Sequence, residues 1–443
     1  MSIDSAVSAD SADPAVSAVS AAPSDEDGRG GRGGRHRVPR GAAFLGVAAV
    51  FVVFLAASSV PSPLYPVYQQ QWHFSAWVLT VVFALYVVGL LSSLLVVGAL
   101  SDHVGRRPVL AAAIALETVS MVLFLTAGNV IALAVARVLQ GIATGAATTT
   151  LSATLVDLEP PHARGRAGVI TSVSPLTGLA LGALGSGVLV EFGPAPTRLV
   201  YALLLGAMVL AATVTALLPE TSPRRPGSLA SLRPRAALPA HLRADIVPVV
   251  PAMIAGWALA GLFLSLGPSV AAQLLGLHSR LVGGVVVTLL AGTGALTVAV
   301  LRSRPAPSLL APASALLGLG VLTALAGVVA DLVWLAAVGT VVAGVGFGAS
   351  VLATFGTFAR IAGPHERSAV FVSANIFSYL GNSLPAVLGG IAVTTLGLRT
   401  ATEIYALTIV VIVSIAFLLR LNQLRAQRRR AVAAPCTRGI SLH

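Results

Sequence analysis

Long apolar stretches separated by short polar connections run through most of the chain. Between Gly41 and Arg420 there are twelve such stretches, each close to the about 20 residues that a helix needs to cross a bilayer. The pattern therefore predicts an all-α membrane protein with twelve transmembrane helices. They cover roughly 42–60, 77–100, 109–127, 130–155, 167–190, 199–218, 247–268, 281–301, 308–328, 332–354, 369–395 and 402–420.

The composition excludes an ordinary soluble protein. Of the 443 residues, 56% are hydrophobic and 10% are charged, whereas soluble domains carry about 25% charged residues. The net charge is +12, but no aromatic residues interleave with the basic ones as they do on surfaces that stack nucleic-acid bases. We therefore expect a lipid bilayer as the surroundings and no nucleic-acid partner.

A Pro- and Arg-rich segment divides the predicted helices into six and six. We predict a disordered cytoplasmic tail over 1–40, a six-helix bundle over 41–218, a cytoplasmic linker over 219–246, a second six-helix bundle over 247–420 and a basic cytoplasmic tail over 421–443. The first segment has a low-complexity composition that cannot bury a core. Because it lacks a basic stretch ahead of an early apolar run, it is not a secretory signal peptide.

The arginines gather in alternate connections. The chain has no lysine, and 24 of its 28 basic residues lie in the two tails and in every second connection. Only Arg198, Arg280 and Arg399 lie in the other connections. Arginine-rich connections stay on the cytoplasmic side, so both termini are predicted to be cytoplasmic. We expect a multi-pass protein of the bacterial plasma membrane.

An internal repeat relates the two halves. The segment 161–164 (PHAR) precedes the fifth predicted helix, and 364–367 (PHER) precedes the eleventh, 203 positions later. At the same offset Gly141 corresponds to Gly344, and Gly145 to Gly348. The repeat predicts two halves of the same topology, an arrangement that has its substrate site near the midplane between them.

The connection between the second and third helices, GALSDHVGRRPVL, carries the most specific motif. Its order of Gly98, Asp102, Gly105, Arg106 and Arg107 resembles the corresponding loop of the major facilitator superfamily. The resemblance implies a secondary transporter that works by alternating access.

The same resemblance implies a gate in this loop. Asp102 would face the start of the eleventh helix across the two halves, where a helix N-terminus favours a carboxylate. Arg106 would reach Asp157 at the inner end of the fourth helix. The alternative is a surface turn whose charges only set the topology.

The fourth helix has a polar face. Arg137, Gln140, Thr144 and Thr148 follow at spacings of three and four, which puts them on one side of the helix. An arginine at membrane depth normally faces the interior of a bundle or an aqueous cavity. The run R-x-x-Q-G resembles the helix-4 signature of proton-linked drug antiporters. We interpret Gln140, Thr144 and Thr148 as substrate-binding candidates, with a helix-packing face as the alternative.

Glu117 is the only acid well inside a predicted span, and we propose it as the proton site. It follows Pro108 by nine residues, so it lies about 13 Å from the inner end of its helix. Arg137 lies about 12 Å from the outer end of the next helix, so an ion pair is possible. Burial favours a neutral carboxyl and an arginine favours a charged one, so their separation would control the proton. Alternatively, Glu117 only lines a helix contact.

The eleventh helix carries Asn375, Tyr379 and Asn382 on one face. Side chains of this kind either bind substrate or hydrogen-bond neighbouring helices. At the end of the first helix, the prolines of PSPLYPVYQQQW predict a break. The aromatic residues there, Tyr65 and Tyr68 among them, are typical of an interfacial belt.

The fifth helix partly resembles an antiporter signature and is predicted to pack closely through its glycines. Ala183 and Ser186 depart from that signature, at positions where it has proline and glycine.

Other chemistry finds no support in the sequence. Without lysine there is no phosphate-binding P-loop, the single Cys436 excludes a cysteine metal site within one chain, and every histidine lies in a connection or tail. We expect no metal, no cofactor and no enzymatic activity.

The sequence favours a monomeric, proton-coupled exporter of a small amphipathic or drug-like compound. The alternatives are proton-coupled uptake of a small metabolite and a transporter-like membrane sensor that moves nothing.

Overall fold

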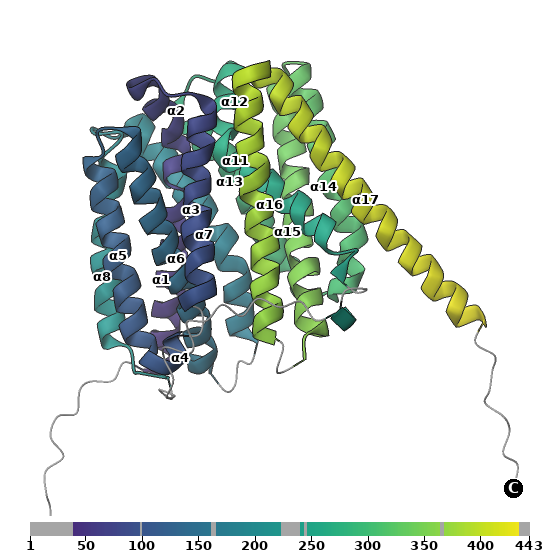
Figure 1. Ribbon diagram of the computed structural model, residues 1–443, viewed down its shortest axis with the longest axis horizontal. Coiled ribbons are helices and arrows are strands. Elements are labelled where there is room, and N and C mark those ends of the chain that lie inside the picture. Colours follow the sequence, from purple (N-terminus) through teal and green to yellow (C-terminus); the bar gives the residue numbers. More distant parts are fainter. Residues whose placement is uncertain are drawn as a thin grey trace, which may run out of the picture. The chain divides into compact units, whose positions relative to one another are not determined.

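A computed structural model describes residues 39–97, 100–160, 165–222, 240–242, 246–363 and 367–433. Within these ranges every regular element is a helix, as the apolar pattern predicts (Figure 1). Gly98, the repeated segment 161–164, most of the linker and most of the 364–367 repeat lie outside the described residues.

The first half of the chain supplies six spans. The first span is Arg40–Trp72, made of two consecutive helices, and α4 is a single short turn in the 2–3 loop. The helices are α1 (Arg40–Ser59), α2 (Pro61–Trp72), α3 (Ala76–Val97), α4 (Leu100–Val104), α5 (Arg106–Thr126), α6 (Val130–Leu158), α7 (Arg166–Phe192) and α8 (Leu199–Leu217).

The second half repeats this order after the short turn η2 (Ala240–Leu242). Its helices are α11 (Val250–Ser265), α12 (Gly267–Gln273), α13 (Arg280–Leu301), α14 (Ala306–Val329), α15 (Val333–Ile361), α16 (Arg367–Leu396) and α17 (Leu398–Ala433). The pair α11 and α12 is bent by 56°. Among the described residues, 11 helices are long and apolar enough to span a membrane, and the bent pair brings the number to 12.

The first span is interrupted at its prolines, as the sequence predicts, but the predicted aromatic belt is wrong. Helix α1 ends at Ser59, and the span goes on as a second helix, α2, because Pro61 and Pro63 stand in its first turn, where a missing N–H is tolerated. Tyr65 and Tyr68 are 1% and 2% exposed, so they belong to the protein core rather than to a lipid interface. The hydroxyl of Tyr68 donates to that of Tyr201 on α8 at 3.3 Å.

The last helix is longer than the apolar pattern predicts. It continues beyond Arg420 to Ala433. The Arg-, Gln- and Leu-rich residues of this extension are good helix formers even where they are not apolar.

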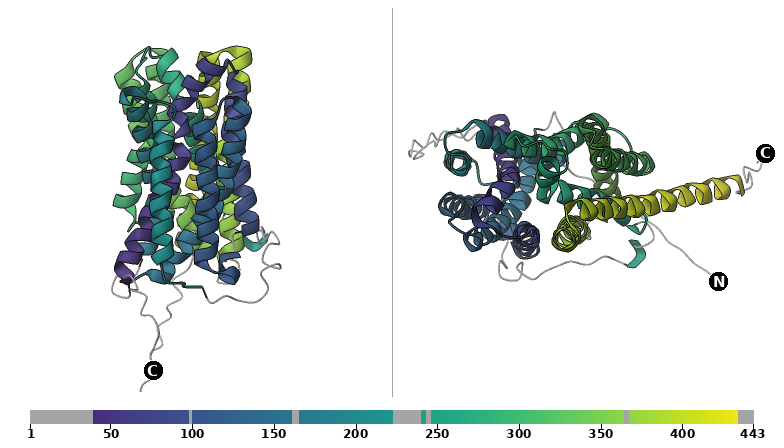
Figure 2. Two further views of the ribbon diagram at one scale, coloured as in Figure 1. Left: turned by 90° about the vertical axis from the view of Figure 1, so that its left-hand side faces the viewer. Right: turned by 90° about the horizontal axis from the view of Figure 1, so that it is seen from above.

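The halves contact each other mainly through α7 with α13 and through α3 with α16 (Figure 2). A Cβ added at Gly284 would overlap the carbonyl oxygen of Ala183, so the α7 and α13 backbones touch. At the end of this seam, Glu191 Oε2 accepts a hydrogen bond from the backbone N–H of Arg280 at 2.8 Å. In the fifth span, Gly178, Gly182 and Gly187 are also closely packed, whereas a Cβ at Gly185 would meet nothing within 4 Å.

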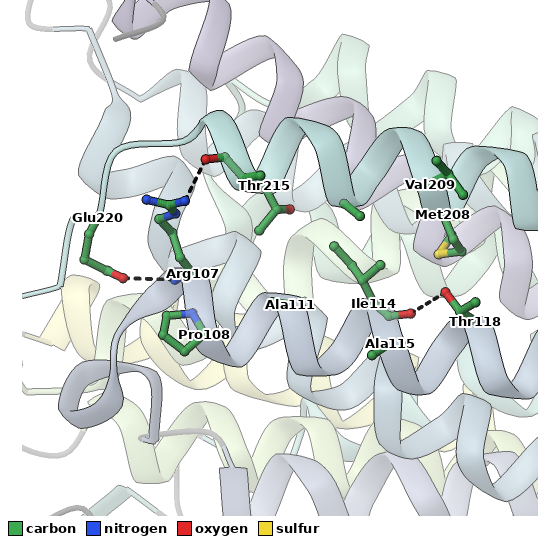
Figure 3. Close-up of a pocket in the computed structure, with 12 residues that line it drawn as sticks. Arg107, Pro108, Ala111, Ile114, Ala115, Thr118, Met208, Val209, Thr215 and Glu220 are labelled. Carbon is green, nitrogen blue, oxygen red and sulfur yellow. Dashed lines mark hydrogen bonds between the residues drawn. The ribbon is translucent and has the colours of Figure 1, made fainter. Parts of the chain in front are cut away.

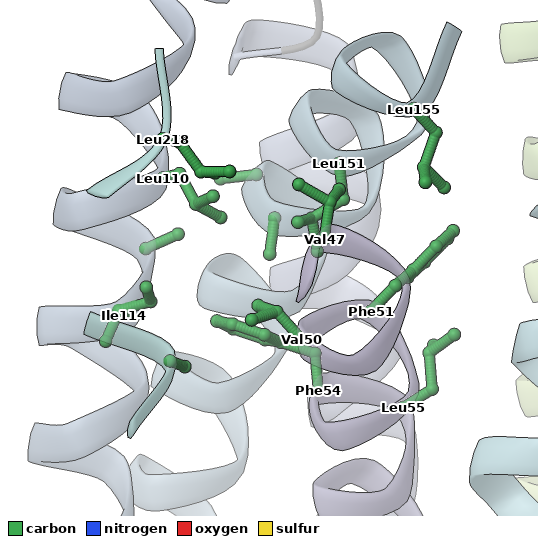
Figure 4. Packing of buried hydrophobic residues seen from close by; sticks show 14 of the residues in the cluster. Val47, Val50, Phe51, Phe54, Leu55, Leu110, Ile114, Leu151, Leu155 and Leu218 are labelled. Atoms are coloured by element: carbon green, nitrogen blue, oxygen red, sulfur yellow. The ribbon is translucent and has the colours of Figure 1, made fainter. Parts of the chain in front are cut away.

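The hydrophobic core differs between the two ends of the molecule. We call the end that carries residues 100–107 the loop side. There, one cluster around Phe51, Leu110 and Leu155 draws only on the first half (Figure 4), and another around Phe358 draws only on the second. At the opposite end, a third cluster combines first-half residues with Leu264, Val287 and Ala386. Of these three clusters, the two on the loop side each stay within one half, and the one at the far side joins the halves.

Candidate functional site

Three polar side chains meet inside the first bundle. Glu117 on α5 and Gln140 on α6 are 0% exposed, and Arg137 on α6 is 1% exposed. The amide nitrogen of Gln140 donates to Glu117 Oε1 at 3.3 Å. Arg137 Nη1 donates to Gln140 Oε1 at 2.6 Å. Gln140 thus bridges the acid and the base, and we call these three residues the buried triad.

The backbone of α1 holds the triad in place. Gln140 Nε2 donates to the carbonyl of Ala57 at 3.0 Å, and Arg137 Nη1 donates to the carbonyl of Ser58 at 3.0 Å. The Ala57 carbonyl would normally accept from the residue four positions later, but that residue is Pro61, which has no N–H. The proline at the α1–α2 junction therefore frees the acceptor that positions Gln140.

The triad keeps two polar atoms without a partner. Glu117 Oε2 and Arg137 Nε are buried and have no hydrogen bond in the structure. Unsatisfied buried groups in a native fold call for an explanation, and a functional role is one of the recognised ones. Glu117 Oε2 could therefore take a proton without breaking a hydrogen bond.

Aromatic residues of α3 cover the arginine. The guanidinium carbon of Arg137 lies 4.5 Å from the ring centroid of Tyr86 and 5.9 Å from that of Phe83. Such stacking stabilises a cation away from water. The sequence analysis did not single out these residues. Their spacing of three was a signal, but a helix that is apolar on nearly every side gives no reason to choose one face.

The threonines of α6 use their hydroxyls within the helix. Thr144 donates to the carbonyl of Gln140 at 2.8 Å, and Thr148 donates to that of Thr144 at 2.6 Å. They lie on the same helix face as the triad, as predicted, and their oxygens keep only acceptor capacity.

The candidates of the eleventh span lie in the other bundle. Asn375 Nδ2 donates to the carbonyl of Phe371 within α16 at 2.9 Å. The Asn382 carbonyl is so close to α11 that a Cβ at Gly261 would overlap it, so Asn382 lies at a helix contact. Tyr379 faces Trp257 on α11, with ring centroids 5.8 Å apart.

The two sets of candidates approach each other through aromatic rings. Tyr379 packs against the cluster that contains Tyr86 and Leu90 of α3. Trp257, which contacts Tyr379, also makes an edge contact with Phe347. The indole N–H of Trp257 is buried without an acceptor. Sequence reasoning missed Trp257, although a tryptophan near the middle of a span, away from the interfaces, was a visible signal.

The charged loop forms a compact network. Arg106 Nη1 lies 2.5 Å from Asp102 Oδ1, and Arg106 Nε lies 3.2 Å from Asp157 Oδ2. Gly105 has a backbone φ of +124°, which residues other than glycine rarely adopt. Gly98 and the side chains that begin α16 lie outside the described residues, so the contact of Asp102 across the halves stays a prediction.

Residues just after α8 hold this loop, and the sequence analysis assigned them no such role. Glu220 accepts from the backbone N–H groups of Arg106 at 2.8 Å and of Arg107 at 3.2 Å, which caps the start of α5. Thr221 donates to Asp157 Oδ2 at 2.9 Å, and Ser222 donates to the carbonyl of Asp102 at 3.0 Å. The segment 220–222 thus joins the parts of the predicted gate.

Comparison with known proteins decides the family. Residues 47–384 match the family described as Major Facilitator Superfamily. The chain belongs to this family. Its family and its fold are those of multi-pass membrane transporters. The MFS-type transporter paaT of Penicillium rubens is 34% identical over 111 residues, which are 25% of this chain and only 20% of the fungal protein.

Solved transporters share the fold. The human organic anion transporter MFSD10 (TETRAN) aligns with TM-score 0.63 and 16% identity, over 87% of this chain and 100% of its own. A bacterial homologue of the human lysosomal transporter Spinster, solved inward-facing and unoccupied, aligns with TM-score 0.66 and 16% identity. The alignment covers 89% of this chain and 99% of that chain. A D-xylose–proton symporter aligns with TM-score 0.64 and 17% identity, over 84% of this chain and 96% of its own. At these identities the likeness concerns the fold.

Proposed function

We propose that the protein is a proton-coupled exporter of a small amphipathic or drug-like compound. The carrying observation is the buried triad, in which a carboxyl group with one unpartnered oxygen is linked through Gln140 to a buried arginine. The arginine distribution supports a bacterial plasma membrane protein with both termini and the loop side in the cytoplasm.

The triad suits coupling because one amide connects both charges. While Gln140 accepts from Arg137 and donates to Glu117, the carboxylate is stabilised from one side. If α1 shifts as the halves rock, the Ala57 and Ser58 carbonyls move, and these two carbonyls hold both Gln140 and Arg137. Glu117 then loses its polar partner and takes a proton on Oε2. When the bridge re-forms, the proton leaves.

The aromatic contact between the bundles favours weakly charged, aromatic cargo. Tyr86, Tyr379 and Trp257 offer ring faces and an unused indole N–H, while Arg137 lies beneath Tyr86 and out of contact with solvent. Rings recognise apolar bodies, and single donors orient them. The same side chains would also suit a small metabolite, so the direction of transport needs its own test.

The test uses purified protein in liposomes with an imposed pH gradient of either sign and the dye Hoechst 33342 as probe. Export by antiport predicts that the dye moves against the proton gradient, and reversing the gradient reverses its movement. Movement with the proton gradient would establish symport. If neither gradient moves this dye or any member of a wider panel of aromatic compounds, the proposal of transport is wrong.

The loop network is proposed as the gate of this cycle. Asp102→Asn keeps the shape and removes the charge that pairs with Arg106. We expect normal insertion and strongly reduced transport. Asp331→Asn is the matched control, because it removes an exposed carboxylate that pairs with Arg399 at 3.0 Å. Unchanged transport by the Asp102 variant would reduce the loop to a topological signal.

A further inference from the structure

A groove on the outer face of the first bundle lies apart from the triad. It runs between α5 and α8 near the loop side and has a volume of about 660 Å³ (Figure 3). The groove exists because the alanines of α5 and α8 are too small to fill the space between the helices, and larger side chains form its walls. The lining residues are Arg107, Pro108, Ala111, Ile114, Ala115, Thr118, Met208, Val209, Ala212, Thr215, Ala216 and Glu220.

The groove has the dimensions and polarity of an acyl chain with a polar head. From Arg107 to Thr118 is eleven residues of helix, or about 16 Å. The wall between is apolar, and the charged residues Arg107 and Glu220 stand together at one end. Ala111 and Ala212 are exposed, and Val209 is 66% exposed, so the groove opens outward, where a membrane protein meets lipid.

The charged end of the groove suits an anion. Arg107 Nη2 donates to the carbonyl of Ala216 at 2.6 Å, which fixes the guanidinium at the rim while using one of its five donors. Glu220 accepts from the N–H groups at the start of α5, so its charge is directed toward that helix end. The remaining guanidinium donors of Arg107 can hydrogen-bond a phosphate, which arginine binds through several N–H groups at once.

We propose that this groove binds one anionic phospholipid of the loop-side leaflet, with an acyl chain between α5 and α8 and its phosphate on Arg107. The proposal requires only that the helices span a bilayer, so it is independent of proton coupling and of the transported compound. Arg107 follows Arg106, which bonds both Asp102 and Asp157. The bound lipid would therefore steady the loop network from outside the bundle.

The experiment uses phosphatidylglycerol with a photoreactive diazirine in one acyl chain, mixed into vesicles that hold the full-length protein. After illumination, labelled peptides are quantified by mass spectrometry. We expect labelling of 107–118 and 208–217 to exceed that of other exposed helices. Arg107→Gln should lower it about fivefold, as an interaction of a single arginine with an anionic lipid surface implies. Ala115→Leu, which fills the groove and keeps every charge, should lower it at least as much.

Two matched controls should keep the label. Ala112→Leu adds the same bulk at an exposed neighbour that does not line the groove, and Arg302→Gln removes a charge from another connection. Uniform labelling of all exposed helices, or equal labelling by the phosphatidylcholine analogue, would overturn the proposal. So would displacement of the lipid by Hoechst 33342 at transport concentrations, because the groove would then belong to the substrate path.

Discussion

The contact between α5 and α6 in the first bundle differs sharply from its counterpart between α14 and α15. At the repeat offset of 203 positions, Glu117 corresponds to Gly320 and Gln140 to Ala343. A Cβ added at Gly320 would overlap the backbone of Ala343, so the two positions face each other as the acid and the amide do. The same helix pair therefore carries a polar network in one half and bare backbone contact in the other.

The counterpart of the arginine completes this contrast. Position 340 is a threonine whose hydroxyl donates to the Ala336 carbonyl of its own helix at 2.8 Å. Thr340 and Ala343 border an apolar cavity of about 250 Å³ within the second bundle. Where the first bundle places Arg137 and Gln140, the second has short side chains and empty space. The ionisable chemistry of the core is thus one-sided, which is why we attribute proton coupling to the first bundle.

The largest expected effect comes from removing the arginine and its counterpart in turn. Arg137→Met leaves Glu117 in the core without the cation to which Gln140 links it, and removing one of two opposite buried charges costs about 3–5 kcal/mol. Thr340→Val removes only a hydrogen bond to the carbonyl of its own helix, and such a bond contributes little to stability. Unfolding free energies measured in detergent by denaturant titration should show this difference. Similar losses at the two positions would mean that the triad carries no special interaction.

The glycine pairs test what the two bundles share. A Cβ at Gly141 would overlap the carbonyl of Tyr86, and one at Gly344 would lie 2.7 Å from the carbonyl of Leu290. Gly141→Ala and Gly344→Ala should therefore each destabilise by about 1–3 kcal/mol through overpacking. Gly185→Ala is the control, because a Cβ there meets nothing within 4 Å. A large loss of stability in only one of these two variants would contradict a packing scaffold shared by both bundles.

The scaffold could be predicted from the sequence because it depends on periodic properties. Span length, the alternation of arginines and the glycine pairs at one offset each follow from local composition. The charged loop was also recognisable, and the structure places Arg106 beside Asp157 at 3.2 Å.

The assembly of the site could not be predicted in the same way, because a helix pattern gives a face but no partner. Gln140 was chosen as a substrate ligand, yet its amide lies between Glu117 and Arg137. Its other partner, the Ala57 carbonyl, is free because Pro61, four positions later, has no N–H to donate. The cover that Tyr86 provides depends in turn on how α3 packs against α6.

The smallest expected effect concerns the apolar cavity in the second bundle. Ala337 lines this cavity, whereas its counterpart Ala134 packs against a hydrophobic cluster in the first bundle. Ala337→Val should stabilise the protein by about 0.5–1 kcal/mol by filling space, whereas Ala134→Val should not. Thermal unfolding of the two variants checks the difference. Equal stabilisation would show that both bundles have room at this position.

The most direct test of one-sided coupling is Glu117→Gln, which keeps the size of the side chain and removes its titration. In liposomes, transport driven by a pH gradient should be lost, while binding of the dye and exchange of dye across the membrane without a gradient should persist. Glu403→Gln, which removes a carboxylate in the second bundle, should keep gradient-driven transport. If the Glu117 variant still concentrates the dye against its gradient, the coupling proton binds elsewhere and the account is wrong.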